Sequence, residues 1–279
     1  MINKNFKNKY KSDGIVKIQK LIDKKILYEL KKKINLVFNN LMIEKKIIKK
    51  SVDIFNTPNV LLKFKKKHLD LFLNVKLKAI QKFPEIYSLG NSQSIIKYLK
   101  LIGIKNPVYS TDPLIMMHHK TTNVSSSGDY APLHQDWRSV QGSLNCAVLW
   151  IPIVEIEKKM GSIEYVPSSH ILGLLPTKKH SWYRAVNSNY IKSYKLKTSK
   201  IKIGDAFLFS SLLAHKSGIN KSNKIRVSLQ FRYNDLEEKS YIERGYPCNY
   251  IHAAPKRRLL KKDVPSLQKV KNFFKYEIF

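Results

Sequence analysis

Residues 107 to 235 of this chain break into short β-prone segments, and this is the feature that most restricts its fold. The segments are YSTDPLIMMHHK, LNCAVLWIPIVEI, SIEYVP, KTSKIKI, DAFLFSSLLAH and IRVSLQFRYND, with Gly, Ser, Asn and Pro residues between them. A helical hydrophobic period is suggested only near residues 180 to 194. Many short strands joined by turns are typical of a β-sandwich or a barrel. We therefore predict a mainly β fold for residues 107–235.

The residues before this region have a different pattern. In DGIVKIQKLIDKKILYELKKKI, alternating apolar residues at 15–18 predict one early strand, and Asp23 can cap a helix with apolar residues at helical spacing. Similar lysine-rich amphipathic segments follow near 57–80 and 92–102, and the charge run KFKKKH is interpreted as a solvent-facing helix surface. Residues 1–106 are thus predicted to be mostly helical.

The domain organisation follows from these two patterns. Residues 236–279 form a charged, mixed segment that is too short for a domain of its own, so we expect it to be a C-terminal extension. The prediction is a single domain over 1–279, mainly β with flanking helices.

The charge balance is extreme, with a formal net charge of +32. Only seven of the 52 basic residues are arginine, and the lysines are spread along the chain. Nucleic-acid sites usually combine arginine with aromatic residues on one face, so a solvated lysine surface is the favoured interpretation. No specific nucleic-acid partner is expected, although anionic partners should be attracted at low salt.

The location is predicted from what the sequence lacks. Its polar N-terminus has no apolar core of a signal peptide, and its longest apolar run, around AVLWIPIV, is too short for a membrane span. Two cysteines, Cys146 and Cys248, are too few for a disulfide framework. We expect a cytoplasmic protein without a membrane span.

The stretch APLHQDWRSV contains the first candidate for chemistry. In an extended segment, side chains two residues apart point to the same side, so His134 and Asp136 can converge on a metal ion. His215, at the end of the apolar segment FLFSSLLAH, is a candidate third ligand, on one face of an expected strand with Ser217. Two histidines and one carboxylate with open positions are the ligand set of non-haem Fe(II) oxygenases.

An arginine completes this constellation. A dicarboxylic 2-oxo acid bound to such a metal needs a second anchor, which arginine supplies through paired hydrogen bonds. Arg226 follows His215 on the expected strand IRVSLQFRY. Arg232, further along the same strand face, fits either a buried carboxylate partner or a substrate contact, while His170 and Asp205 are interpreted as structural turn residues.

These motifs together resemble the phytanoyl-CoA dioxygenase family of Fe(II)/2-oxoglutarate oxygenases. The resemblance rests on HQD at 134–136, GSIEYVPSSH at 161–170, GDAFLF at 204–209, HKSG at 215–218 and RVSLQFRY at 226–233, and it extends to FKNKYKSDGIVKIQKLID near the N-terminus. It implies a double-stranded β-helix, a jelly-roll or cupin-like fold whose open mouth holds the metal.

The resemblance also implies roles for individual residues. His134, Asp136 and His215 would bind Fe(II), and Arg226 would bind the far carboxylate of 2-oxoglutarate. The further cosubstrate contacts it implies are Ser217, Met116, Trp150, Lys120 and Ser228. For Met116 and Trp150, an ordinary position in the core of a β-sandwich remains equally open.

The implied activity is hydroxylation of a C–H bond by Fe(II), 2-oxoglutarate and O2, with release of succinate and CO2. Related halogenases replace the carboxylate ligand with a small residue, whereas this chain keeps Asp136. A polar or anionic small molecule suits the basic surroundings. The segments VSSSGDY and DLEEKSYIERGYP are candidate substrate loops, and Trp137, Arg138, Arg244 and Tyr246 are candidates for the substrate side.

Two other classes remain open. One is a non-catalytic jelly-roll binding protein that keeps only the scaffold, and the other is a basic, nucleic-acid-associated oxygenase. The first predicts no metal-dependent formation of succinate, and the second predicts binding that survives physiological salt.

Overall fold

A six-stranded antiparallel sheet forms the centre of the computed structural model, which describes residues 2–122, 129–180, 183–247 and 265–277. The strand order in this main sheet is β1 (Ile15–Ile18), β9 (Ala206–Ser210), β4 (Ala147–Pro152), β11 (Arg226–Asp235) and β2 (Pro107–Tyr109). The sixth strand, β3 (Leu114–His118), pairs with the first half of β11, while β2 pairs with its end. Within the residues that the structure describes, the last strand therefore lies in the middle of the sheet.

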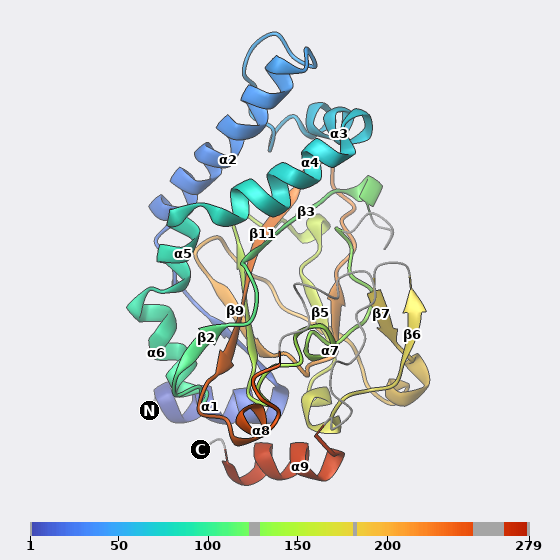
Figure 1. Cartoon of the computed structure of the whole chain (residues 1–279). Coiled ribbons are helices and arrows are strands. Elements are labelled where there is room, and N and C mark those ends of the chain that lie inside the picture. Colours follow the sequence, from blue (N-terminus) through green and yellow to red (C-terminus); the bar gives the residue numbers. More distant parts are fainter. Residues whose placement is uncertain (1, 123–128, 181–182, 248–264, 278–279) are drawn as a thin grey trace.

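A smaller sheet faces the main one. It has the order β10 (His215–Ser217), β5 (Ile163–Tyr165) and β8 (Lys197–Thr198), and residues 131–134 run beside β10 through backbone hydrogen bonds. A separate hairpin consists of β6 (Thr177–His180) and β7 (Tyr183–Val186). Figure 1 shows β5 and the hairpin to one side of β11 and β9.

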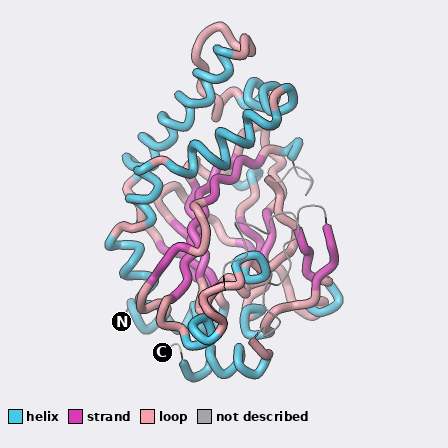
Figure 2. Tube along the Cα trace, viewed as in Figure 1, coloured by secondary structure: helices cyan, strands magenta, loops and turns pink. Residues whose placement is uncertain are grey.

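Alternating side chains give the main sheet two apolar faces. Leu149 and Phe231 belong to the large core that this sheet forms with the N-terminal helices, whereas Trp150 and Phe209 pack with Ile163 of the smaller sheet. Because successive residues of a strand point to opposite faces, one strand can serve both cores. The result is a layer of helices, the main sheet and the smaller sheet (Figure 2).

The helices occupy mainly the first part of the chain, as the sequence predicted. Asp23 caps α2 by accepting a hydrogen bond from the backbone N of Lys25 at 2.8 Å, and Leu27, Leu30 and Ile34 of that helix are buried at helical spacing. The α-helices are α1 (Ile2–Asp13), α2 (Lys24–Glu44), α3 (Pro58–Lys67), α4 (Leu69–Asn74), α5 (Pro84–Gly90), α6 (Gln93–Leu101), α7 (Trp137–Val140), α8 (Lys239–Glu243) and α9 (Leu267–Asn272). Shorter turns of π- or 3-10 helix are η1 (Val75–Ala79), η2 (Ile80–Lys82), η3 (Lys120–Thr122), η5 (Lys158–Met160), η6 (Ser169–Leu172), η7 (Ser188–Ile191) and η8 (Phe273–Glu277).

One expectation about the strands is wrong. The segment FLFSSLLAH is not one strand, because β9 ends at Ser210 and a turn carries the chain from the main sheet to β10 in the smaller sheet. In this turn the backbone N of Leu213 donates to the carbonyl of Ser210 at 2.9 Å. His215 therefore begins a strand rather than ending one. Near 180–194, the chain forms β7 and the short turn η7 instead of a long helix.

Within the described ranges, no helix is both long enough and apolar enough to cross a lipid bilayer.

Candidate metal centre and its cavity

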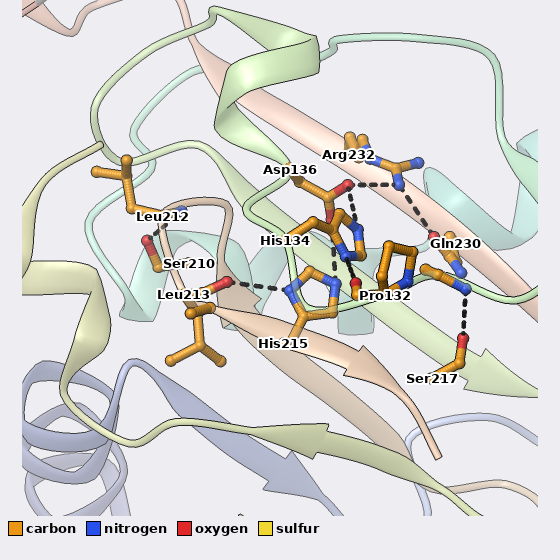
Figure 3. A network of polar contacts seen from close by, with 12 residues as sticks. Pro132, His134, Asp136, Ser210, Leu212, Leu213, His215, Ser217, Gln230 and Arg232 are labelled. Carbon is orange, nitrogen blue, oxygen red and sulfur yellow. Dashed lines mark hydrogen bonds and ion pairs between the residues drawn. The ribbon is translucent and has the colours of Figure 1, made fainter. Parts of the chain in front are cut away.

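His134, Asp136 and His215 come together between the two sheets. One ligand atom from each lies within 4.8 Å of the others. The Nε2 atoms of His134 and His215 lie 3.7 and 3.6 Å from the two carboxylate oxygens of Asp136 (Figure 3). The two histidines are also neighbours across the smaller sheet, because the backbone N of each donates to the carbonyl of the other, at 2.9 and 3.0 Å. The sequence prediction that these three side chains converge is confirmed geometrically.

Backbone carbonyls orient both imidazoles. Nδ1 of His134 lies 2.7 Å from the carbonyl oxygen of Pro132, and Nδ1 of His215 lies 3.0 Å from that of Leu213. A carbonyl oxygen can only accept, so in a neutral ring Nδ1 carries the proton and Nε2 keeps its lone pair. Burial, and then the neighbouring His134, lower the pKa of His215 to about 4. His215 is therefore neutral near neutral pH, which is the state that binds a metal.

Asp136 is a buried carboxylate whose charge is stabilised on one side. Burial raises its pKa, but Arg232 and the two histidines outweigh that effect and hold the pKa well below its usual value. Nη2 of Arg232 donates to Oδ1 of Asp136 at 2.9 Å and to Oε1 of Gln230 at 3.0 Å. Of the two roles left open for Arg232, the structure supports that of buried carboxylate partner.

Gln135, the middle residue of HQD, fixes the motif from behind. Its amide nitrogen donates to the carbonyls of Gly173 and Leu212 at 2.8 and 2.6 Å, and its amide oxygen accepts from the backbone N of Leu175 at 2.8 Å. These bonds hold Gln135 away from the cluster while its two neighbours face it. Asp136 itself has helical backbone angles and precedes α7, so the motif is not a regular strand, although its side chains converge as expected.

The donor set fits a divalent metal. Oδ2 of Asp136 is buried and has no hydrogen-bond partner among the described residues. A buried carboxylate oxygen without a donor is costly, and a cation beside it would remove that cost. Two imidazole nitrogens and this oxygen make a two-histidine, one-carboxylate set that leaves positions open for other ligands.

The cluster opens into a cavity of about 890 Å³. Arg226 lines the same cavity and is 4% exposed. Its Nη1 donates to the carbonyls of Gly161 and Gly218 at 3.0 and 3.3 Å, which anchors the guanidinium. Burial lowers its pKa to about 10, so the side chain stays charged near neutral pH.

The other predicted cosubstrate contacts divide into two groups. Ser217, Met116 and Trp150 line the cavity. Ser217 Oγ also accepts from the backbone N of Ala131 at 3.1 Å. Lys120 is an exposed residue of η3, beyond the end of β3, and does not line the cavity. Ser228 is a buried residue of β11 and does not line the cavity either.

The candidates for the substrate side do not line the cavity. Trp137 is 2% exposed and packs in a core with Val140 and Phe273. Arg244 lies over the Trp137 ring at 5.2 Å and donates to the carbonyls of Gln141 and Gly142. Arg138 and Tyr246 are also outside the lining residues. Arg244 is therefore a structural residue, contrary to expectation.

His170 and Asp205 have the structural roles expected of them. His170 is buried and its Nε2 lies 3.1 Å from the carbonyl of Lys11, while Asp205 accepts from the backbone N atoms of Lys20 and Lys202.

Sequence reasoning missed the wall of the cavity that α3, α4 and η1 supply. Lys65 and Lys76 line the cavity there, and both donate to Asp129, which is 1% exposed. The run KFKKKH is thus not wholly a solvent-facing surface. Asp129 belongs to the candidate loop VSSSGDY, of which residues 124–128 lie outside the described residues.

Comparison with known proteins agrees with this geometry. The model of the family described as phytanoyl-CoA dioxygenase matches residues 10–228. Peroxisomal phytanoyl-CoA dioxygenase of Bos taurus is 24% identical over 216 residues, covering 72% of this chain and 58% of the bovine protein. Methylphosphonate hydroxylase of Gimesia maris is 26% identical over 135 residues, covering 48% of this chain and 51% of that protein. The chain spans little more than half the length of these curated relatives.

Solved structures show the same fold at low sequence identity. AviO1 from Streptomyces viridochromogenes has a TM-score of 0.55 at 15% identity, covering 85% of this chain and 96% of the other. EctD from S. alaskensis, solved with 2-oxoglutarate and 5-hydroxyectoine, has a TM-score of 0.54 at 11% identity, covering 84% and 76%. SnoK, described as a non-heme alpha ketoglutarate dependent carbocyclase, has a TM-score of 0.53 at 14% identity, covering 86% and 90%.

Proposed function

The chain belongs to the phytanoyl-CoA dioxygenase family, and on that premise we propose that it is an Fe(II)- and 2-oxoglutarate-dependent oxygenase that hydroxylates a C–H bond of a small molecule. The observation that carries the proposal is the convergence of His134, Asp136 and His215 in the same cavity as a buried Arg226. The alternative of a non-catalytic binding protein gives no reason for Asp136 Oδ2 to be buried without a donor.

The fold proposed with this function is a double-stranded β-helix within a single domain over 1–279. Its two layers would be the main sheet and the smaller sheet, which share an apolar interior formed by Trp150, Phe209 and Ile163. The metal ligands and Arg226 lie toward this interior, where both sheets contribute to the cavity lining.

In this proposal His134, Asp136 and His215 hold Fe(II). With 2-oxoglutarate and O2, the bound metal would supply the oxidising chemistry, and the overall reaction would yield succinate and CO2. Arg232 stabilises the charge of Asp136 through Oδ1, which would leave Oδ2 to hold the metal. In the neutral rings, the carbonyls of Pro132 and Leu213 place the proton on Nδ1, which leaves the lone pair of each Nε2 for a metal.

Arg226 would bind the far carboxylate of 2-oxoglutarate, because a buried guanidinium offers paired donors to it. Ser217, Met116 and Trp150 would form the walls around the cosubstrate. Lys120 and Ser228 do not line the cavity, so we assign them no contact. Hydroxylation rather than halogenation is favoured by the presence of Asp136 as a ligand.

The test is anaerobic addition of Fe(II) and 2-oxoglutarate to the purified protein, followed by visible spectroscopy. A weak charge-transfer band is expected for wild type, and His215→Ala should abolish it. Arg226→Ala should weaken it by lowering the affinity for 2-oxoglutarate. His180→Ala and Arg184→Ala, which change residues outside the cavity lining, are the matched controls.

A folded, metal-loaded protein without this band would contradict the proposal and favour the non-catalytic binding protein. The hydroxylation step is tested separately, by mass spectrometry of candidate substrates incubated with labelled dioxygen. A product that gains one labelled oxygen atom supports it.

A further inference from the structure

The outer part of the cavity has a charge arrangement that the proposed metal and cosubstrate do not use. Lys65 of α3 and Lys76 of η1 line the cavity, and both donate to Asp129, at 2.5 Å each. The side chains of Lys65 and Lys76 are 15% and 3% exposed, and that of Asp129 is 1% exposed. Asp129 is not among the lining residues, so it holds the two ammonium groups from behind.

This cluster, Lys65, Lys76 and Asp129, carries a surplus positive charge. Burial raises the pKa of Asp129, but Lys76 and Lys65 outweigh that effect and lower it, so the carboxylate is ionised. Two ammonium groups then share one carboxylate. By contrast, Arg232 and Lys216, which also line the cavity, each have a carboxylate of their own, Asp136 and Glu164.

The two ammonium groups also have donors to spare. Each has three N–H groups, and each makes one hydrogen bond, to Asp129, within the described part of the chain. Both also lie over the ring of Phe72, at 5.2 and 5.9 Å. A buried cation with unused donors is stabilised by an anion that accepts from them.

Apolar side chains surround this cluster. Leu62, Leu69, Leu73 and Leu77 line the cavity from α3, α4 and η1. Leu69 and Leu77 are 49% and 40% exposed, so these two leucines of the cavity wall are in contact with water. A ligand with an apolar body would remove them from water.

The position of this cluster relative to the metal centre limits the length of the ligand. Asp129 precedes His134 by five residues, so their Cα atoms lie at most about 17 Å apart. Lys65, Lys76 and the metal ligands line the same cavity, so a ligand held by the cluster at one end can extend toward the metal centre.

We propose that Lys65 and Lys76, held by Asp129, bind the anionic group of the substrate, which is an amphiphile with one oxyanion head and an apolar body of moderate length. This inference rests on the proposed function, because it identifies the ligand as the substrate. Binding of the ligand itself requires only the cavity. Lys65 and Lys76 would determine specificity, and Asp129 would be a positioning residue.

The experiment measures binding of octanoate, 1-octanol and octylamine by isothermal titration calorimetry to protein loaded anaerobically with Fe(II) and 2-oxoglutarate. The three probes share one chain and differ in the charge of the head group. The variants are Lys65→Met and Lys76→Met, with Lys63→Met, an exposed residue of α3 outside the cavity lining, as the matched control.

We expect octanoate to bind wild type about tenfold or more tightly than 1-octanol, because charge-assisted hydrogen bonds add to the apolar contact. Lys65→Met and Lys76→Met should each weaken octanoate about tenfold and leave 1-octanol within about twofold, while Lys63→Met changes neither. Lys65 is the more exposed of the pair, so its variant keeps the test decisive if Lys76→Met does not fold.

Three results would overturn the inference: equal affinity for octanoate and 1-octanol, the same behaviour for the Lys65 and Lys63 variants, or equal losses for both probes. Failure of the proposed function is seen separately. The charge-transfer band of wild type reports on that function, whereas the calorimetry can be repeated with metal-free protein.

Discussion

Replacing Arg232 by methionine tests whether the buried ion pair belongs to the metal centre. Arg232 and Asp136 each have a side-chain exposure of 5%, and their contact distance is 2.9 Å. Removing one partner of a buried pair leaves an uncompensated charge, which costs about 3–5 kcal/mol. We expect Arg232→Met to lower the free energy of unfolding of the metal-free protein by about 3 kcal/mol, since Asp136 can relieve part of the cost by taking up a proton.

A bound divalent cation should return part of this loss, because it places positive charge beside the same carboxylate. The assay is urea denaturation followed by circular dichroism, with and without saturating Co(II), which avoids the oxidation of Fe(II). The cost of Arg232→Met should be smaller by about 1 kcal/mol or more when Co(II) is bound. Arg184→Met, which changes a half-buried arginine of β7 bonded to Thr177, is the control and should show no dependence on metal.

An equal loss with and without Co(II) would refute the reasoning, because Arg232 would then act only through the packing of β11. If Arg232→Met did not lower the free energy of unfolding of the metal-free protein, the ion pair would make no net contribution to stability.

Three further predictions follow from contacts around the site. His170 is buried and its pKa is lowered by burial from 6.5 to about 4, so the unfolded chain binds the proton first and acid should reduce stability. The loss should develop from about pH 6.5 down to about pH 4 and reach up to about 3 kcal/mol. Denaturation at several pH values should show a flatter profile for His170→Leu, and an unchanged slope would speak against this assignment. Gln135→Leu removes the hydrogen bonds that hold the HQD motif, so metal affinity should fall about tenfold or more in a competition titration with a chromophoric chelator. Unaltered affinity would show that Gln135 only fills space. A Cβ at Gly218 would lie 2.2 Å from the carbonyl oxygen of Ser162, so Gly218→Ala should displace the backbone that anchors Arg226 and weaken 2-oxoglutarate binding. Gly245→Ala, with φ +67 and no atom within 4 Å of its Cβ, is the control that carries backbone strain alone, and equal effects of both variants would refute the claim.

The sequence was sufficient for the parts of the site that depend on local pattern. His134 and Asp136 were found from their spacing, and His215 and Arg226 from their places in β-prone segments. The structure brings all four to one cavity. Local pattern could not decide between two roles for Arg232, because either role puts the side chain on the same face of the strand.

The missed features depend on contacts between distant residues. Lys76 lies in a lysine-rich segment, and only its meeting with Asp129 explains why that lysine is 3% exposed. The error in FLFSSLLAH has a similar cause. Leu212 and Leu213 are buried in two different clusters, so the apolar run continues on both sides of a turn that only Ser210 and Ser211 mark.

The central position of β11 has a consequence for how the protein is made. This strand is the last that the described residues form, yet it pairs with β4 on one side and with β3 and β2 on the other. Until it has been synthesised, those strands have unpaired edges, which are prone to pair with other chains. Arg226 and Arg232 are both carried by β11. A ribosome-bound chain that ends before this strand therefore lacks a complete main sheet and both arginines at once, so completion of that sheet and acquisition of its two arginines are a single event.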